Sequence, residues 1–176
     1  MNSNAEAALE FTSRAEAPAR SAWTVWLITA AIAVTIIALI IAAPLAQAFA
    51  HPQVASSIYK WFSFVCHQMP ERSFYLAGCQ FAVCSRCTGL YSGFAGAVLF
   101  YPVVRPLKSI DAPRRIWLIL AAVPLAIDFS LGYFAIWPNT HLSRFATGAL
   151  LGSVAVFFIM PGLIELSSAF GRRLAR

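Results

Sequence analysis

Residues 66–93 read CHQMPERSFYLAGCQFAVCSRCTGLYSG, and they hold every cysteine of the chain: Cys66, Cys79, Cys84 and Cys87. The same stretch contains one of the three histidines and two arginines: His67, Arg72 and Arg86. Long apolar segments lie on both sides of it. The stretch is therefore a polar element in a chain that is otherwise suited to lipid.

The composition indicates a membrane protein. Of the 176 residues, 60% are hydrophobic and only 11% are charged, with a mean hydropathy of +0.71. In soluble domains about a quarter of the residues are charged. A chain this apolar suits lipid better than water, so we expect the lipid bilayer as its partner. The net charge of +6 fits membrane orientation, as shown below, and no nucleic-acid partner is expected.

Four apolar segments predict four membrane spans, at about residues 23–44, 86–104, 116–137 and 144–165. Residues 23–43 form an uninterrupted apolar run of 21 residues, enough to cross a hydrocarbon core of about 30 Å. The alternative for this run is a cleaved signal peptide, because Ala46-Gln47-Ala48 resembles a cleavage site. Its length and the absence of an adjoining basic cluster favour an uncleaved helix. The predicted fold is all-α and integral to the membrane, with the four helices arranged as two hairpins.

The remaining segments complete the predicted organisation. Residues 1–22 are polar and predict a disordered cytoplasmic tail, and residues 166–176 a basic cytoplasmic tail, on either side of a membrane domain over 23–165. The loop of residues 45–85 is rich in cysteine, and it lies between the first and second spans. Within it we expect a short interfacial helix over 53–65 and a hairpin over 74–83 with its turn near Gly78.

The distribution of basic residues predicts the orientation of the spans. With four spans, one side of the membrane carries nine Lys and Arg residues: Arg14, Arg20, Arg105, Lys108, Arg114, Arg115, Arg172, Arg173 and Arg176. The other side carries four: Lys60, Arg72, Arg86 and Arg144. The more basic side is cytoplasmic by the positive-inside rule. We therefore expect a multi-pass protein of the cell membrane with both termini in the cytoplasm and the cysteine loop outside it.

The second and fourth spans begin alike. Arg86 is followed by Thr88-Gly89 and Gly93, and Arg144 is followed by Thr147-Gly148 and Gly152. Two hairpins related by an axis along the membrane normal would produce this similarity. The alternative is chance, because small residues are common in membrane helices.

The cysteine spacing predicts a metal site. Cys84 and Cys87 form a C-x2-C pair, and 17 residues separate Cys66 from Cys84, as in structural zinc sites. The adjacent His67 completes a candidate ligand set of Cys66, His67, Cys84 and Cys87, with zinc as the expected cofactor. Adjacent side chains tend to diverge, so the fourth ligand is His67, Cys79 or a water. An open fourth position is what a catalytic zinc requires.

Two other interpretations of the cysteines stay open. A loop outside the cytoplasm lies in a compartment that permits disulfides, and four cysteines allow two bridges. Cys84 and Cys87 also lie at the start of a helix, where thiolates are stabilised, so the pair suits a redox-active dithiol. The neighbouring His67 favours the metal.

Charged residues near the outer ends of the spans are the catalytic candidates. Asp128 lies inside the third span, where an acid is costly and is a candidate functional residue, and its expected partner is Arg144 or Arg86. A structural Asp–Arg pair is the alternative. If the hairpins pack together, Arg72, Arg86 and Arg144 gather near the cysteine loop. That surplus of positive charge suits a phosphate or carboxylate, such as an anionic small molecule or a lipid head group.

These motifs resemble those of a family of small prokaryotic polytopic membrane proteins of unknown function. The family signature is Cys-His-Gln, then Pro-x-Arg-Ser, then Cys-x-Arg-Cys-Thr-Gly-x-Tyr-x-Gly, and it is similar to residues 66–68, 70–73 and 84–93. Later family elements correspond to Asp128, Asn139, Arg144, Thr147, Gly148 and Gly152. The resemblance implies a polytopic membrane protein with a metal site, and it supplies no reaction. Cys79 is outside the signature, which implies a shared set of three cysteines and disfavours a purely disulfide account.

Four function classes follow for this integral membrane protein with a zinc site at the outer face. The first is a membrane-embedded metalloenzyme acting on a lipid or another anionic substrate. The second is a non-enzymatic protein whose metal or disulfide is structural. The third is a small transporter or metal-handling protein, for which four spans with one acid would require a homo-oligomer. The fourth is a thiol oxidoreductase that uses Cys84 and Cys87.

Overall fold

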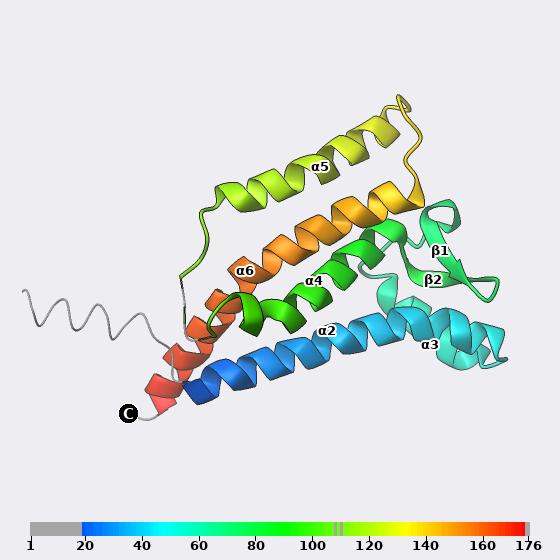
Figure 1. The fold of residues 1–176 in the computed structure, drawn as a ribbon. Coiled ribbons are helices and arrows are strands. Elements are labelled where there is room, and N and C mark those ends of the chain that lie inside the picture. Colours follow the sequence, from blue (N-terminus) through cyan, green and yellow to red (C-terminus); the bar gives the residue numbers. More distant parts are fainter. Residues whose placement is uncertain (1–18, 108, 110, 175–176) are drawn as a thin grey trace, which may run out of the picture.

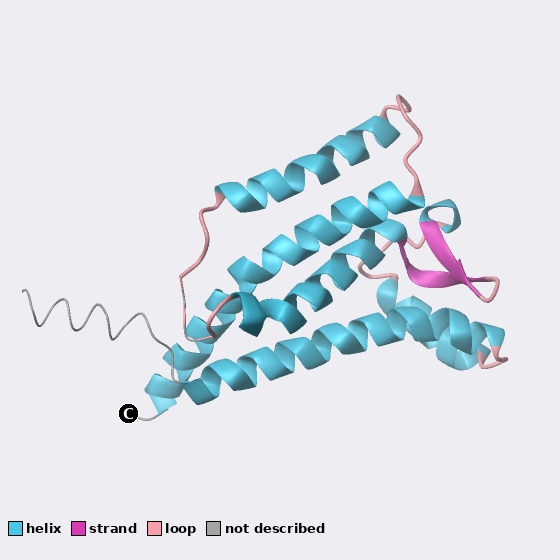
Figure 2. Ribbon diagram, in the orientation of Figure 1, coloured by secondary structure: helices cyan, strands magenta, loops and turns pink. Residues whose placement is uncertain are grey.

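The computed structural model describes residues 19–107, 109 and 111–174 (Figures 1 and 2). Its elements in chain order are α2 (Ala19–Ala48), α3 (Pro52–Phe62), a 3-10 turn η1 (Pro70–Arg72), β1 (Ser73–Leu76), β2 (Cys79–Cys84), α4 (Ser85–Val104), α5 (Ile116–Tyr133) and α6 (His141–Leu174). Four of these helices, α2, α4, α5 and α6, are long and apolar enough to cross a membrane. The predicted four-span helical fold is confirmed.

The first helix is longer than the sequence predicted. We expected Pro44 to end the first span, but α2 continues through it to Ala48. Proline also lies inside the other three membrane helices, at Pro102, Pro124 and Pro161. Membrane helices tolerate proline because neighbouring elements and local adjustments satisfy the freed backbone groups. Proline was therefore a poor marker of helix ends in this chain.

The predicted tails also differ from the structure. Residues 1–18 of the expected N-terminal tail lie outside the described residues, whereas Ala19–Ala22 already belong to α2. At the other end, most of the predicted basic tail is helical, because α6 continues to Leu174 instead of ending near residue 165.

The turn between α5 and α6 is set by local backbone chemistry. Ala135 has a φ of 54°, and the N–H groups of Ile136 and Trp137 both donate to the Leu131 carbonyl, at 3.0 and 3.3 Å. This is a left-handed helix C-cap, so α5 ends at Tyr133 and not at 137. Thr140 caps the next helix, since its Oγ1 accepts the Ser143 N–H at 3.0 Å. That cap starts α6 three residues before the predicted 144.

Helices α4 and α6 make the most extensive contact of any two helices in the described part of the chain, and they run parallel (Figure 1). A Cβ on Gly89 would collide with the Phe145 backbone, and one on Gly148 would collide with the Arg86 carbonyl. Gly93 meets the Ala149 backbone in the same way. Small residues let membrane helices approach this closely. The contacts are reciprocal, which supports the view that the second and fourth spans are equivalent parts of a repeat.

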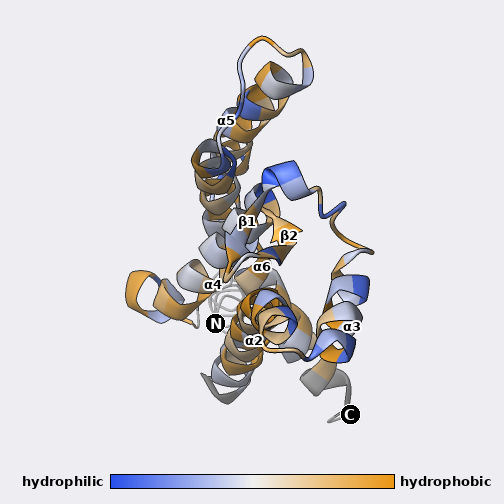
Figure 3. Cartoon of the chain, turned by 90° about the vertical axis from the view of Figure 1, so that its right-hand side faces the viewer, coloured by the Kyte–Doolittle hydropathy of each residue, from blue (hydrophilic) through white to orange (hydrophobic). Residues whose placement is uncertain are grey.

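The helices that flank this pair pack very differently. Helix α2 lies along α4 and contributes Ala22 and Ala30 to one core cluster, and Ile40 and Ala43 to another. That this helix remains uncleaved stays a prediction. Helix α5 packs mainly on α6, and Ala121 is its one buried residue. Many of the exposed residues of these helices are large and apolar, as lipid requires. Figure 3 colours the chain by hydropathy and shows hydrophobic residues along the long helices.

The loop between α2 and α4 folds into a small domain at one end of the bundle (Figure 1). Helix α3 turns back against α2, and it begins one residue before and ends three residues before the predicted range of 53–65. Strands β1 and β2 pair antiparallel, with Leu76 opposite Cys79, which confirms the predicted hairpin. Ala77 and Gly78 between them both have positive φ, 52° and 76°, as a tight hairpin turn demands.

Candidate metal centre and adjacent polar cluster

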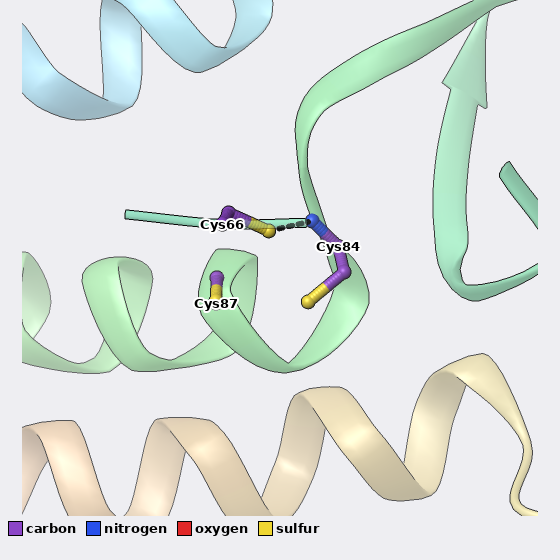
Figure 4. A group of neighbouring side chains, drawn as sticks. All are labelled: Cys66, Cys84 and Cys87. Carbon is purple, nitrogen blue, oxygen red and sulfur yellow. Dashed lines mark hydrogen bonds between the residues drawn. The ribbon is translucent and has the colours of Figure 1, made fainter. Parts of the chain in front are cut away.

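Three cysteine sulfurs meet where the loop domain joins α4 (Figure 4). Cys66 follows α3, Cys84 ends β2, and Cys87 lies in the first turn of α4. Their Sγ atoms all lie within 4.8 Å of one another, with Cys66 buried and the other two partly buried. None of the four cysteines forms a disulfide, and a bridge between two of these three would leave the third without a partner.

Backbone N–H groups point at the Cys66 sulfur. The N–H of Cys84 donates to it at 3.2 Å, and that of Gln68 donates at 3.5 Å. Hydrogen bonds from the thiols of Cys66 and Cys87 lower the pKa of the Cys84 thiol far below its usual range, against the effect of burial. The backbone N–H groups of Cys87 and Arg86 at the start of α4 act in the same direction. The site therefore stabilises a thiolate at Cys84, and the thiolate is the form of cysteine that binds metals.

Gln68 holds together the segments that carry these cysteines. Its Nε2 donates to the carbonyls of Tyr59 in α3 and Ala82 in β2, at 2.7 and 2.8 Å. Its own carbonyl accepts from Gln80 Nε2 at 2.6 Å, and its backbone has a φ of 51°. These bonds fix the turn after Cys66 against the strand that ends in Cys84.

The donor set fits a soft divalent ion. A tetrahedral zinc with sulfurs at about 2.3 Å would hold those sulfurs about 3.8 Å apart, within the observed limit of 4.8 Å. His67 is exposed and is not in the group, and neither is Cys79. Among the described residues the cluster therefore supplies three thiolates. His67 as a ligand stays a prediction that nothing in the structure tests.

A second polar cluster lies at the same end of the bundle. Arg86 Nη2 of α4 donates to Asp128 Oδ2 of α5, and its guanidinium lies 5.5 Å from the ring centre of Phe129. Ser143 Oγ of α6 donates to Asp128 Oδ1 at 2.8 Å, and the Asn139 amide donates to the Asp128 carbonyl. Of the two expected partners of Asp128, the structure places Arg86 in contact with it.

Ser85 connects the two clusters. Its hydroxyl is fully buried and donates to the Arg72 carbonyl at 2.7 Å, while His141 Nδ1 lies 2.9 Å from the same oxygen. A hydroxyl has one proton, and the carbonyl can only accept. The His141 Nδ1 therefore carries a proton and donates to Ser85, and in the neutral imidazole Nε2 is then the nitrogen with the lone pair. Ser85 thus fixes the backbone of Arg72 and the imidazole at the start of α6.

Arg144 lies beside both clusters. Its guanidinium is partly buried and is repelled by Arg72 and Arg86, and it is attracted by Asp128 and Cys84. Three of the residues that organise these clusters, Gln68, Ser85 and Ser143, were not among the predicted site residues. Gln68 belongs to the Cys-His-Gln motif, so the motif carried a signal. Ser85 and Ser143 had none, because their partners are distant in sequence.

These observations define a class of protein. The chain is a polytopic helical membrane protein with a cysteine cluster able to hold a metal ion, set against a polar cluster rich in arginine. Residues 66–158 match the family described as "Predicted membrane protein (DUF2085)", and the chain belongs to that family. The matched segment begins at Cys66 and includes Cys84, Cys87, Asp128 and Arg144.

Two archaeal relatives are similar over most of their own length. "Uncharacterized protein MJ1492" of Methanocaldococcus jannaschii is 34% identical over 113 residues, 64% of this chain and 72% of that protein. An "Uncharacterized protein" of Methanothermobacter thermautotrophicus is 36% identical over 91 residues, 52% of this chain and 80% of that protein. No solved structure matches the chain.

Proposed function

We propose that this protein is a membrane metalloenzyme with a zinc centre at the outer membrane face, acting on a lipid or another anionic substrate. The observation that carries the proposal is the group of three cysteine sulfurs within 4.8 Å of one another. Three protein ligands leave one tetrahedral position for water or substrate, and a zinc ion there supplies Lewis-acid chemistry.

The surrounding residues suit such a centre. The N–H groups of Gln68 and Cys84 hold the Cys66 sulfur in place, so the ligand geometry is set by the fold. The free Nε2 of His141 is a candidate proton acceptor, because Ser85 fixes the other ring nitrogen. Arg144 interacts electrostatically with Cys84, which supports it as the residue that would hold an anion near the metal.

The second candidate function is a structural metal site in a non-enzymatic membrane protein. It is favoured by the way the three cysteines join the end of α3, strand β2 and helix α4. A metal there would fasten the loop domain to the bundle without reacting with anything.

Two measurements on the detergent-purified protein test whether it binds zinc. They are elemental analysis and a count of free thiols after unfolding without reductant. One zinc and four free thiols are expected, whereas no metal and no free thiols would overturn the proposal. Replacing zinc by Co²⁺ then separates the two functions. An open position predicts that the visible cobalt bands shift when a small thiol ligand is added, and a closed structural site predicts unchanged bands.

A further inference from the structure

Arg144, near the start of α6, is a cation without an ion pair among the described residues. Among the described residues its guanidinium forms no hydrogen bond and no ion pair, and it is partly buried. The similarity between the second and fourth spans accounts for the missing ion pair of Arg144. Arg86 opens α4 and is paired with Asp128 on α5, the helix that flanks α6. Arg144 opens α6 in the equivalent way, but helix α2, which flanks α4, contains no acidic residue.

The neighbouring residues Arg86 and Arg72 also have side-chain N–H groups that are available to a ligand. Arg86 Nε is buried and has no hydrogen-bond partner, although Nη2 of the same side chain is bound to Asp128. Among the described residues the guanidinium of Arg72 has an ion pair only with Glu71, at 3.8 Å, and both side chains are largely exposed, at 48% and 62%. Such a solvated pair is weak. Asp128 is already paired to Arg86, so among the described residues Arg144 has no ion-pair partner of its own.

Two helix N-termini meet at the same place. Helices α4 and α6 run parallel, and the contact between Ser85 and His141 joins their first residues. Parallel helices direct the positive ends of both dipoles toward the same region. The helix ends and the arginines therefore favour the same kind of ligand.

From this arrangement we infer that Arg72, Arg86 and Arg144 form a binding site for a phosphate group. Arginine recognises phosphate with several parallel donors, and a partly buried, unpaired guanidinium gains most from such a ligand. The inference rests on the proposed function, since the bound phosphate would belong to its substrate. It narrows the anionic substrate to a phosphate ester, either a lipid or a water-soluble molecule.

An apolar pocket beside the site favours a lipid as the molecule that carries the phosphate group. A cavity of ≈ 390 Å³ lies between α2, the hairpin, α4 and α6, and its wall includes Ile37, Ile40 and Phe74. Phe74 also packs against His141 and Phe145, with ring centres 5.7 and 5.9 Å apart. Phe74 therefore lies between this cavity and the polar cluster, so an acyl chain in the cavity would have its head group near the arginines.

Binding of two probes to the full-length protein in a neutral detergent tests the inference. The probes are inorganic phosphate and dihexanoyl phosphatidic acid, and dihexanoyl phosphatidylcholine serves as the matched zwitterionic lipid. The variants are Arg144→Gln, Arg144→Lys and Arg105→Gln, of which the last removes a charge at the opposite end of the bundle. Isothermal titration gives the affinity, and thermal unfolding of each variant shows whether it is folded.

We expect at least one phosphate probe to bind, and Arg144→Gln to weaken it about tenfold to a hundredfold. Arg144→Lys should recover part of the affinity, and Arg105→Gln should retain all of it. Binding of phosphatidic acid alone identifies a lipid, and equal binding of both probes identifies a soluble phosphate. No binding of either probe, or equal losses in Arg105→Gln and Arg144→Gln, overturns the inference. Zinc content is measured on the same samples, so phosphate binding without zinc would reject the proposed metalloenzyme and retain this site.

Discussion

The backbone N–H of Cys84 donates to the Sγ of Cys66 at 3.2 Å. The bond joins the end of β2 to the turn after α3, 18 residues earlier in the chain. It shows that the fold brings these two cysteines together through the backbone, and that no disulfide is needed for their meeting. A preformed thiolate site of this kind has ligands whose separation is fixed before an ion arrives.

The first prediction concerns the division of the cysteines. Cys66→Ser, Cys84→Ser and Cys87→Ser should each lose the bound metal, because each removes one of three thiolate ligands. Cys79→Ser is the matched control and should retain one ion per chain, since its sulfur is outside the group. Elemental analysis of the four purified variants checks this. A loss of metal in Cys79→Ser equal to that in the others would show that the ligand set is wrong.

The second prediction concerns the close approach of α4 and α6. A Cβ on Gly93 would lie 2.7 Å from the Ala149 Cα, so Gly93→Ala should lower the free energy of unfolding by about 1–3 kcal/mol. Gly96, one turn further along α4, has nothing within 4 Å of its Cβ position. Gly96→Ala should change little or stabilise by up to about 1 kcal/mol.

Unfolding of both glycine variants in mixed detergent micelles, followed by circular dichroism, makes this comparison. Similar stabilities for the two variants would mean that α4 and α6 are not packed as the structure shows. A further variant, Gly148→Ala on α6, should behave like Gly93→Ala, because its Cβ would collide with the Arg86 carbonyl.

Hydropathy was sufficient to predict the four spans but not their ends. The ends depend on single residues whose effect is local. Ala135 adopts a left-handed conformation, which its residue type does not predict, and Thr140 caps α6 from within the segment that separates the predicted spans. Pro44 had the opposite effect and made the predicted first span too short. A proline that ends a helix in water can lie inside a helix in lipid.

The cysteine group was predictable and its surroundings were not. The C-x2-C spacing places Cys84 and Cys87 on the first turn of a helix, and Cys66 follows from the familiar gap between ligand groups. Gln68 acts through the carbonyls of Tyr59 and Ala82, which meet only in the folded chain. Sequence alone left Asp128 with two candidate arginines for the same reason.

The third prediction concerns Gln68, whose side chain connects α3 to β2. Gln68→Leu leaves two carbonyls without their donor, so metal affinity should fall by about 10- to 100-fold, as for other residues that orient ligands. Gln53→Leu is the control, since residue 53 is exposed in α3. Competition with a zinc-binding dye measures the affinity, and equal values for the two variants would refute the role of Gln68.

The fourth prediction concerns orientation. The count of nine basic residues against four predicts cytoplasmic termini and an outer loop domain. Alkaline phosphatase is active only outside the cytoplasm, so it should be inactive when fused after residue 176. The same enzyme inserted in the tight turn at Ala77 and Gly78 should be active. The reverse pattern would place the candidate metal centre in the cytoplasm.

The fifth prediction concerns the ion pair between Arg86 and Asp128. The two side chains are only 22% and 10% exposed, so Asp128→Asn leaves a poorly solvated guanidinium and should cost about 1.5–3 kcal/mol of stability. Asp111→Asn, at an exposed position, is the control and should be close to neutral. Denaturant unfolding in micelles measures both variants.

The double variant Asp128→Asn with Arg86→Gln separates a structural pair from a functional one. If the pair serves only to fasten α5, the double variant should be less destabilised than the sum of the single ones, with a coupling of about 0.5–3 kcal/mol. The same variant should also weaken phosphate binding, because Arg86 supplies a donor to the proposed site as well as to Asp128. Recovered stability with unchanged phosphate affinity would assign Arg86 to the fold alone and leave Arg72 and Arg144 as the binding residues.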